Sequence, residues 1–527
     1  MSDEAAAFDA LVEEFFSVWF RYHPDLAAAQ GVSGFERLLP AQGDDELAAL
    51  GAWLESLVVA LEELDYPALD PGRQLDLCLM FGAARVEHQE LLERDWRRRD
   101  PLRFLAVGRI DRLLLDPPPD IGDRLVALLA GVPDYLRLAL TRLRTLAELA
   151  PPALVDAAVE ETERGRCALR ELVASPWLRR SGEDLGRIES AAHAACDALA
   201  TFGGALRAEI AGRAAGRLGC GGRHLRFLLR HRHFMDLEPR RAQADLEAAL
   251  GRCQDQLAAH CASLGVAPDR IFERLGADAI DSSRRLDRYR AESERLAALV
   301  ASHQLLSLPA AELRIREPPP CPRPLGLGAD DYVADPHAGR GTFFLAPLAS
   351  GGAGLEPLAC VRARCLDRTW TGDHLLAFAA GNRGWRLPRR LSDAASLTGA
   401  WRLYVRERLE ELGCLEPNDR LLALTHRCAA IQRGLLDLEL HLGELTETEA
   451  KARLASIRGG GTADLIRLAR RPGNALAGVL GWRALNAARE RALRAEGFSE
   501  AAFHDRLFSA GRVPLSLILA REAESLG

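Results

Sequence analysis

The sequence contains almost no lysine. Lys451 is the one lysine among 68 basic residues, and arginine supplies the others. Planar guanidinium forks suit phosphate or carboxylate recognition, but a GC-rich coding bias produces the same composition. There is no excess of basic charge, because the formal net charge is −7 and the sequence isoelectric point is near 6.1. The chain therefore lacks the phosphate-neutralising surface of a nucleic-acid-binding protein, and no nucleic-acid partner is expected.

Long hydrophobic runs are also missing. A bilayer-spanning helix needs about 20 consecutive apolar residues, and charged residues interrupt every run of that length. The first residues, Met1-Ser2-Asp3-Glu4, are acidic and lead into an amphipathic stretch without the basic and apolar regions of a secretory signal. These absences predict a soluble, unexported, cytoplasmic protein with no membrane partner.

The cysteines form no recognisable framework. Their number, 11, is odd, and no Cys-x-x-Cys pair occurs. Several of them, such as Cys78, Cys167 and Cys196, lie in helical apolar patterns. We therefore expect reduced, buried cysteines rather than a disulfide scaffold or a zinc ribbon.

What the sequence does contain is helical periodicity. The chain has 527 residues, of which 48% are hydrophobic, so it can bury a large core. Apolar residues recur at three-and-four spacing in the segments 8–22, 45–64, 73–94 and 122–149. Prolines such as Pro151 and Pro152 separate these segments, because proline ends one helix and is tolerated in the first turn of the next. The pattern predicts a mostly α-helical fold.

The strongest interruption is the proline-rich stretch 317–326. Each proline restricts its own backbone and that of the preceding residue, so this stretch is extended or turning. We place a division near it, with an N-terminal helical lobe over 1–320 and a C-terminal lobe over 321–527. Glycines flank a short β-prone run soon afterwards, which predicts a strand over 341–346.

The sequence has no His-Glu-x-x-His motif, which in zinc hydrolases places two ligands and a general base on one helical face. Such enzymes need His and carboxylate ligands, an open position for water, and a base that takes the water's proton. In place of that motif, residues 367–376 read Asp-Arg-Thr-Trp-Thr-Gly-Asp-His-Leu-Leu. Nearby segments with a distinctive pattern are 341–344 (Gly-Thr-Phe-Phe), 399–404 (Gly-Ala-Trp-Arg-Leu-Tyr), 472–478 (Pro-Gly-Asn-Ala-Leu-Ala-Gly) and 511–515 (Gly-Arg-Val-Pro-Leu).

In order and spacing, these segments resemble the bacterial family known as domain of unknown function 885, which looks like a helical zinc metallopeptidase family. The resemblance implies a large two-lobed peptidase-like fold with a central channel. Family members carry His-Glu-x-x-Pro-Gly-His-His-Leu-Gln where this chain has 367–376, so Gly372, His374 and Leu375 match and the leading His and Glu do not. They carry Glu-Gly-Trp-Ala-Leu-Tyr where this chain has 399–404.

The resemblance thus marks a degenerate metal site. The positions concerned are Asp367, Arg368, Asp373, His374 and Gly399. Arg368 stands where the family has its general base, and a guanidinium repels a cation and accepts no proton. Gly399 stands where the family has a ligand carboxylate, and Gly478 replaces a family tyrosine as a separate loss. No zinc and no other cofactor are expected.

A second group of residues is a candidate cleft. It comprises Trp401, Tyr404, Arg433, Asp437 and His441. Arg433, Asp437 and His441 follow one another at intervals of four residues, so they form one stripe on a helix. Either the stripe lines the former substrate cleft, with Asp437 orienting His441 or holding Arg433 for a substrate carboxylate, or it is a network that joins helices. The neighbouring pair His504 and Asp505 is expected to hydrogen-bond between helices.

Three functions are open on these grounds. The leading hypothesis is a non-catalytic, degenerate homologue of a zinc metallopeptidase that keeps a cleft for a peptide or small-molecule ligand. The second is a metal-dependent hydrolase with a site rebuilt around Asp367, Asp373, His374 and His441. The third is a helical scaffold or interaction protein with no cleft.

Overall fold

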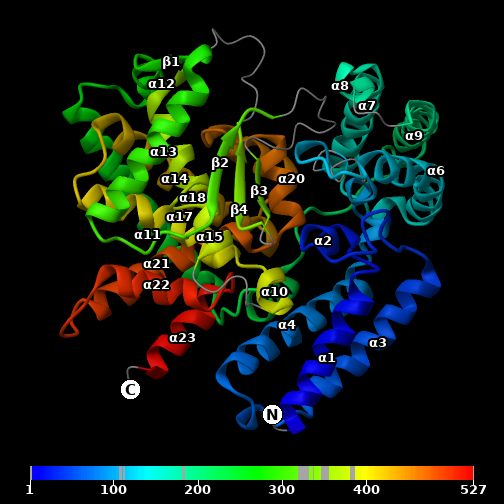
Figure 1. The fold of residues 1–527 in the computed structure, drawn as a ribbon, viewed down its shortest axis with the longest axis horizontal. Helices are drawn as coiled ribbons and strands as arrows, with labels where there is room; N and C mark the ends of the chain where they lie inside the picture. Colours follow the sequence, from blue (N-terminus) through cyan, green and yellow to red (C-terminus); the bar gives the residue numbers. More distant parts are fainter. Residues whose placement is uncertain are drawn as a thin grey trace. The chain divides into compact units, whose positions relative to one another are not determined.

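The structure is a computed structural model that describes residues 3–105, 110, 113–180, 184–318, 331–335, 338–345, 355–379 and 386–525 (Figure 1). Helices make up most of these residues and strands only a few, so the predicted fold class is confirmed. In this part of the chain, no helix is long and apolar enough to cross a membrane.

The chain forms two compact units. The first contains Met1–Leu218 and Pro318–Gly328, and the second contains Gly219–Glu317 and Ala329–Gly527. The compact units thus divide the chain at residue 218, and the lobe division near residue 320 stays a prediction. Most of the proline-rich stretch on which that prediction depends lies outside the described residues.

The described residues of the first unit form helices and no strands. Its α-helices are α1 (Asp3–Trp19), α2 (Pro24–Ala29), α3 (Asp44–Glu62), α4 (Pro71–Arg94), α6 (Ile121–Thr145), α7 (Pro152–Ala174), α8 (Pro176–Arg180) and α9 (Leu185–Ala205). Four of them match the predicted periodic segments. On α6 the buried residues include Leu125, Leu129, Val132 and Leu136, at the spacing that places them on one helical face.

The second unit contains the remaining elements. Its helices are α10 (Gly222–His231), α11 (Pro239–Ser263), α12 (Ile271–Gly276), α13 (Arg285–Ser302), α14 (Leu358–Arg368), α15 (Asp373–Phe378), α16 (Leu387–Leu391), α17 (Ala395–Glu411), α18 (Pro417–Leu442), α19 (Glu447–Ser456), α20 (Thr462–Arg470), α21 (Asn474–Ala492), α22 (Glu500–Ser509) and α23 (Leu515–Ser525). Helix α18 is buried along most of its length. A helix that is buried on nearly all sides is a core element, so α18 positions the helices around it.

A small mixed sheet lies in the second unit. Its strand order is β2 (Glu312–Arg316), β4 (Arg340–Phe344), β3 (Asp331–Asp335), with β2 parallel and β3 antiparallel to β4 (Figure 1). The central strand β4 corresponds to the strand predicted over 341–346. A two-stranded sheet pairs β1 (Ala279–Asp281) with β5 (Leu355–Pro357).

The burial of the cysteines agrees with the prediction from the sequence only in part. Cys196 is buried as predicted, whereas Cys78 is half-buried and Cys167 is exposed. Cys167 lies on α7, whose buried face carries Ala168, Leu169 and Leu172, so the thiol falls outside the core. Burial of Cys167 was therefore a wrong prediction. None of the cysteines in the described ranges forms a disulfide bond.

Candidate functional site

The segment 367–376, where the resemblance implies a zinc motif, is not one continuous helix. Helix α14 ends at Arg368 and helix α15 begins at Asp373. Gly372 makes the return between them possible, because a Cβ atom there would lie 2.0 Å from the carbonyl oxygen of Asp367. The side chain of Thr371 helps to close this turn by donating to the carbonyl of Leu366 at 2.9 Å. Asp367 and Asp373 are thus brought to neighbouring helix ends.

Guanidinium groups surround these two carboxylates. Asp367 pairs with Arg406 at 2.7 Å, and Asp373 pairs with Arg402 at 2.8 Å and also with Arg368. We call these five residues the arginine network. Its three cations outnumber its two anions, which makes a net positive charge. Burial disfavours the charge on Asp367, but Arg406 and Arg402 outweigh that effect and lower its pKa.

Solvent reaches part of the arginine network. The side chains of Arg402 and Asp367 are 37% and 29% exposed. His426, on α18, is also exposed, yet the protein around it lowers its pKa to about 4, and Arg406 adds to this effect. The network therefore offers a polar, partly wet surface to a ligand.

His374 faces away from this network and toward the sheet. Its ring is fully buried, with Nδ1 accepting from the Tyr332 hydroxyl at 2.7 Å and Nε2 donating to the carbonyl of Ala311 at 3.1 Å. Gly341 leaves room for this pair, because a Cβ atom there would lie 1.8 Å from the Tyr332 oxygen and 2.7 Å from Nδ1. Both ring nitrogens are occupied, so neither is free for a metal.

Gly399 and Gly478 face each other where α17 and α21 cross. A Cβ atom on Gly399 would lie 2.8 Å from the Cα atom of Gly478, and one on Gly478 would lie 3.2 Å from the Cα atom of Gly399. The two losses that the sequence presents as separate are therefore one structural feature. Where the resemblance implies a carboxylate and a tyrosine, two helix backbones touch.

Trp401 and Tyr404 do not line a cleft, contrary to the prediction. Both side chains are fully buried. The indole N–H of Trp401 donates to the carbonyl of Thr371 at 2.7 Å, and the Tyr404 hydroxyl bonds to Nε2 of His504 at 2.8 Å. These bonds attach α17 to the turn after α14 and to α22. The aromatic residues are core residues because each polar tip finds a partner inside the protein.

The stripe on α18 also differs from the cleft prediction. Asp437 and His441 are fully buried, and Arg433 pairs with Asp464 at 2.8 Å rather than with Asp437. Asp437 accepts three backbone N–H bonds at the start of α21, although burial raises its pKa to about 7. The ring of His441 accepts from the amide of Cys220 at 3.0 Å. These contacts connect segments of the second unit.

His441 consequently does not join Asp367, Asp373 and His374. In the part of the chain that the structure describes, no group of three His, Cys, Asp or Glu side chains is close enough to hold a metal ion. Each of the four has other partners, so the rebuilt metal site is not assembled in this arrangement.

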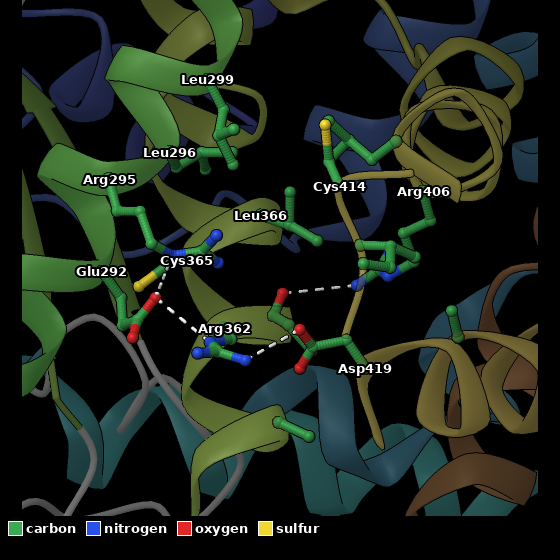
Figure 2. Close-up of a pocket in the computed structure, with 15 residues that line it drawn as sticks. Glu292, Arg295, Leu296, Leu299, Arg362, Cys365, Leu366, Arg406, Cys414 and Asp419 are labelled. Atoms are coloured by element: carbon green, nitrogen blue, oxygen red, sulfur yellow. Dashed lines mark hydrogen bonds and ion pairs between the residues drawn. The ribbon is translucent and has the colours of Figure 1, made fainter. Parts of the chain in front are cut away.

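A small cavity adjoins the arginine network through Arg406. It has a volume of about 30 Å³, room for about two water molecules. Figure 2 shows Arg362 between Glu292 and Asp419, to which it donates at 3.3 and 3.0 Å.

Sequence reasoning missed Arg402 and Arg406 as site residues. Their i,i+4 spacing on α17 was visible, but nothing in the sequence connects them with Asp367.

Residues 24–521 match the family described as bacterial protein of unknown function, DUF885. The chain belongs to the DUF885 family. No curated protein matches the sequence. A candidate lipoprotein from Colwellia psychrerythraea has the same fold with a TM-score of 0.79 at 15% identity, over 99% of each chain. A candidate lipoprotein of unknown function from Shewanella oneidensis aligns with a TM-score of 0.72 at 15% identity, over 99% of this chain and 100% of that one.

These comparisons establish the family and the fold. Neither the DUF885 description nor the two structures name an activity, so the peptidase resemblance is carried forward only as a proposal. The cytoplasmic location also stays a prediction, because both structures are described as candidate lipoproteins.

The buried histidines predict an acid-sensitive fold. Burial lowers the pKa of His374 and of His504 to about 4, whereas an unfolded histidine has a pKa near 6.5. Between these values the unfolded chain binds more protons, so the free energy of unfolding decreases as pH falls from about 6.5 to 4. Each group contributes roughly 3 kcal/mol to this loss.

Urea denaturation between pH 7.5 and 4.5 tests this expectation. In the His504→Gln variant, unfolding near pH 5 should take up about one proton less than in the wild-type chain. An unchanged pH slope in that variant would show that His504 is not held neutral in the folded state.

Proposed function

We propose that this chain is a non-catalytic member of the DUF885 family, in which an arginine network takes the place of a hydrolytic metal site. The observation that carries the proposal is the pairing of Asp367 and Asp373 with Arg368, Arg402 and Arg406. Guanidinium groups stay charged at any physiological pH. They neutralise both carboxylates, repel a divalent cation and cannot act as a general base.

The same charges favour an anionic ligand. The network has an excess of one positive charge, and part of the Arg402 side chain is exposed. Guanidinium groups bind carboxylates through short, charge-assisted hydrogen bonds. The ligand we propose is a peptide C-terminus or a small carboxylic acid.

Metal content is the first test of this proposal. The chain is purified without added metal, and bound zinc, manganese, iron and nickel are measured by elemental analysis. We expect less than about 0.1 metal ion per chain, because the folded chain does not bring a set of metal ligands together. Stoichiometric metal that disappears in the His374→Ala or Asp373→Ala variant would contradict the proposal and support the metal-dependent hydrolase.

Ligand binding is the second part of the test. Short acetylated peptides with a free C-terminal carboxylate are titrated by calorimetry, and the same peptides with a C-terminal amide serve as the ligand control. Arg402→Gln should weaken binding roughly tenfold or more, because a charged hydrogen bond is worth about 1.5–3 kcal/mol. Arg420→Gln is the matched protein control, because Arg420 is exposed on α18 and pairs with Glu410. If neither form of the peptide binds, the result would favour the third hypothesis, a helical scaffold or interaction protein.

A further inference from the structure

Two cysteine sulfur atoms lie in contact inside the second unit. Cys253 is on α11 and Cys428 is on α18, and their Sγ atoms are 2.9 Å apart. The side chains are 3% and 7% exposed and belong to one hydrophobic cluster. The cysteines are 175 positions apart in the sequence. The packing of α11 on α18 therefore brings together two thiols that no sequence motif connects.

A separation of 2.9 Å is shorter than sulfur atoms keep in ordinary nonbonded contact. A disulfide bond has a sulfur–sulfur length of about 2.05 Å, so a movement of less than about 1 Å, shared between two side chains, would complete one. Neither backbone has to move far, because both thiols already point into the same space between the helices.

The surroundings favour the reactive form of one thiol. Its hydrogen bond with Cys253 lowers the pKa of Cys428, burial opposes this, and the neighbouring Arg427 lowers the pKa further. Arg427 is itself buried and is held by Glu407 and Glu410. The contact with Cys428 and burial raise the pKa of Cys253. The thiolate is the nucleophile in thiol–disulfide exchange, so the fixed guanidinium favours Cys428 as the thiol that attacks once the two helices have packed.

We propose that Cys253 and Cys428 form a disulfide bond that joins α11 to α18 when the chain folds in the presence of a small-molecule disulfide. Before the helices pack, the Cys253 thiolate attacks one sulfur of oxidised glutathione, which forms a mixed disulfide and releases one glutathione thiolate. As α11 packs on α18, the Cys428 thiolate attacks the Cys253 sulfur and releases the second glutathione thiolate. The two cysteine protons pass to the two glutathione thiolates, so both cysteines are oxidised and one glutathione disulfide is reduced.

The bond would fix the helix that carries much of the described polar core. Helix α18 contributes the buried side chains of Asp437 and His441, and α11 packs along it. Cross-linking two positions this far apart removes conformations from the unfolded chain and thus stabilises the folded one. The proposal is independent of whether the chain binds a ligand or a metal.

Peptide mapping of the full chain tests the bond directly. The protein is refolded in a buffer of reduced and oxidised glutathione, alkylated, and digested with trypsin without reduction. Cleavage at arginine gives one peptide of residues 253–270, which contains Cys253 and Cys261, and a second of residues 428–433, which contains Cys428. We expect these two peptides to be linked, and nine of the 11 cysteines to be alkylated.

Cys261→Ala and Cys253→Ala form a matched pair of variants, because both cysteines lie on α11 and both are buried. The link should persist in Cys261→Ala and disappear in Cys253→Ala. Reduction should lower the Tm of the wild-type chain and of Cys261→Ala by roughly 5 °C or more. Alkylation of all cysteines in the wild-type chain after refolding would overturn the proposal, and that result does not depend on the folding of either variant.

Discussion

Gly399→Glu, which introduces the carboxylate that the resemblance implies at this position, is expected to destabilise the chain by more than about 3 kcal/mol. The new Cβ atom would lie 2.8 Å from the Cα atom of Gly478, so α17 and α21 would have to move apart. Overpacking of this kind typically costs about 1–3 kcal/mol. The glutamate also brings a charge into a helix crossing, which adds a desolvation cost. Restoring one ligand residue should therefore damage the fold and produce no metal site.

Urea denaturation of two alanine variants separates crowding from charge. Gly399→Ala should cost about 1–3 kcal/mol in the free energy of unfolding, since the Cβ atom alone makes the collision. Gly251→Ala is the matched control, because Gly251 lies within α11 and a Cβ atom there meets nothing within 4 Å. It should stabilise the chain by up to about 1 kcal/mol through helix propensity. Equal stability of both variants would mean that α17 and α21 do not touch at Gly399.

The glycine pair illustrates what the sequence could predict about the site. The resemblance marked both positions and implied that each has lost a family side chain. It treated the losses as separate because Gly399 and Gly478 are 79 positions apart in the sequence and periodicity carries no information about which helices cross. The same limit applies to Asp367, whose partner Arg406 lies on another helix. Local patterns therefore predicted the elements, whereas the pairing of side chains required the tertiary structure.

The prediction that Trp401 and Tyr404 line a cleft differs from the structure for a related reason. Trp401 and Tyr404 were assigned to a cleft because they belong to a motif next to the degenerate metal site. In the fold, Thr371 and His504 satisfy their polar tips. A sequence cannot show whether an indole N–H or a phenol hydroxyl meets a ligand or another part of the chain. Helical periodicity, by contrast, depends only on neighbouring residues, and the predicted helices 45–64 and 73–94 correspond to α3 and α4.

Asp437→Ala is expected to cost about 4 kcal/mol or more in the free energy of unfolding. The Asp437 carboxylate is fully buried and accepts from the amides of Gly473, Ala475 and Leu476 at 3.0, 3.0 and 3.1 Å. These amides open α21, and the first amides of a helix have no partner within the helix. Alanine would leave three donors unsatisfied, two of them buried and one half-buried, at about 1–3 kcal/mol for each buried donor.

Asp70→Ala is the control that separates the effect of burial from the loss of a helix cap. Asp70 caps α4 in the same way, by accepting from the amides of Gly72 and Arg73, but these bonds are exposed to solvent. Water can replace the lost carboxylate there, so we expect a cost of about 1 kcal/mol. Asp437→Asn should fall between the two alanine variants, because its one amide oxygen can still accept while its NH₂ group opposes a donor. Similar losses in Asp437→Ala and Asp70→Ala would show that water reaches the start of α21 and that Asp437 is not the buried cap that joins α18 to it.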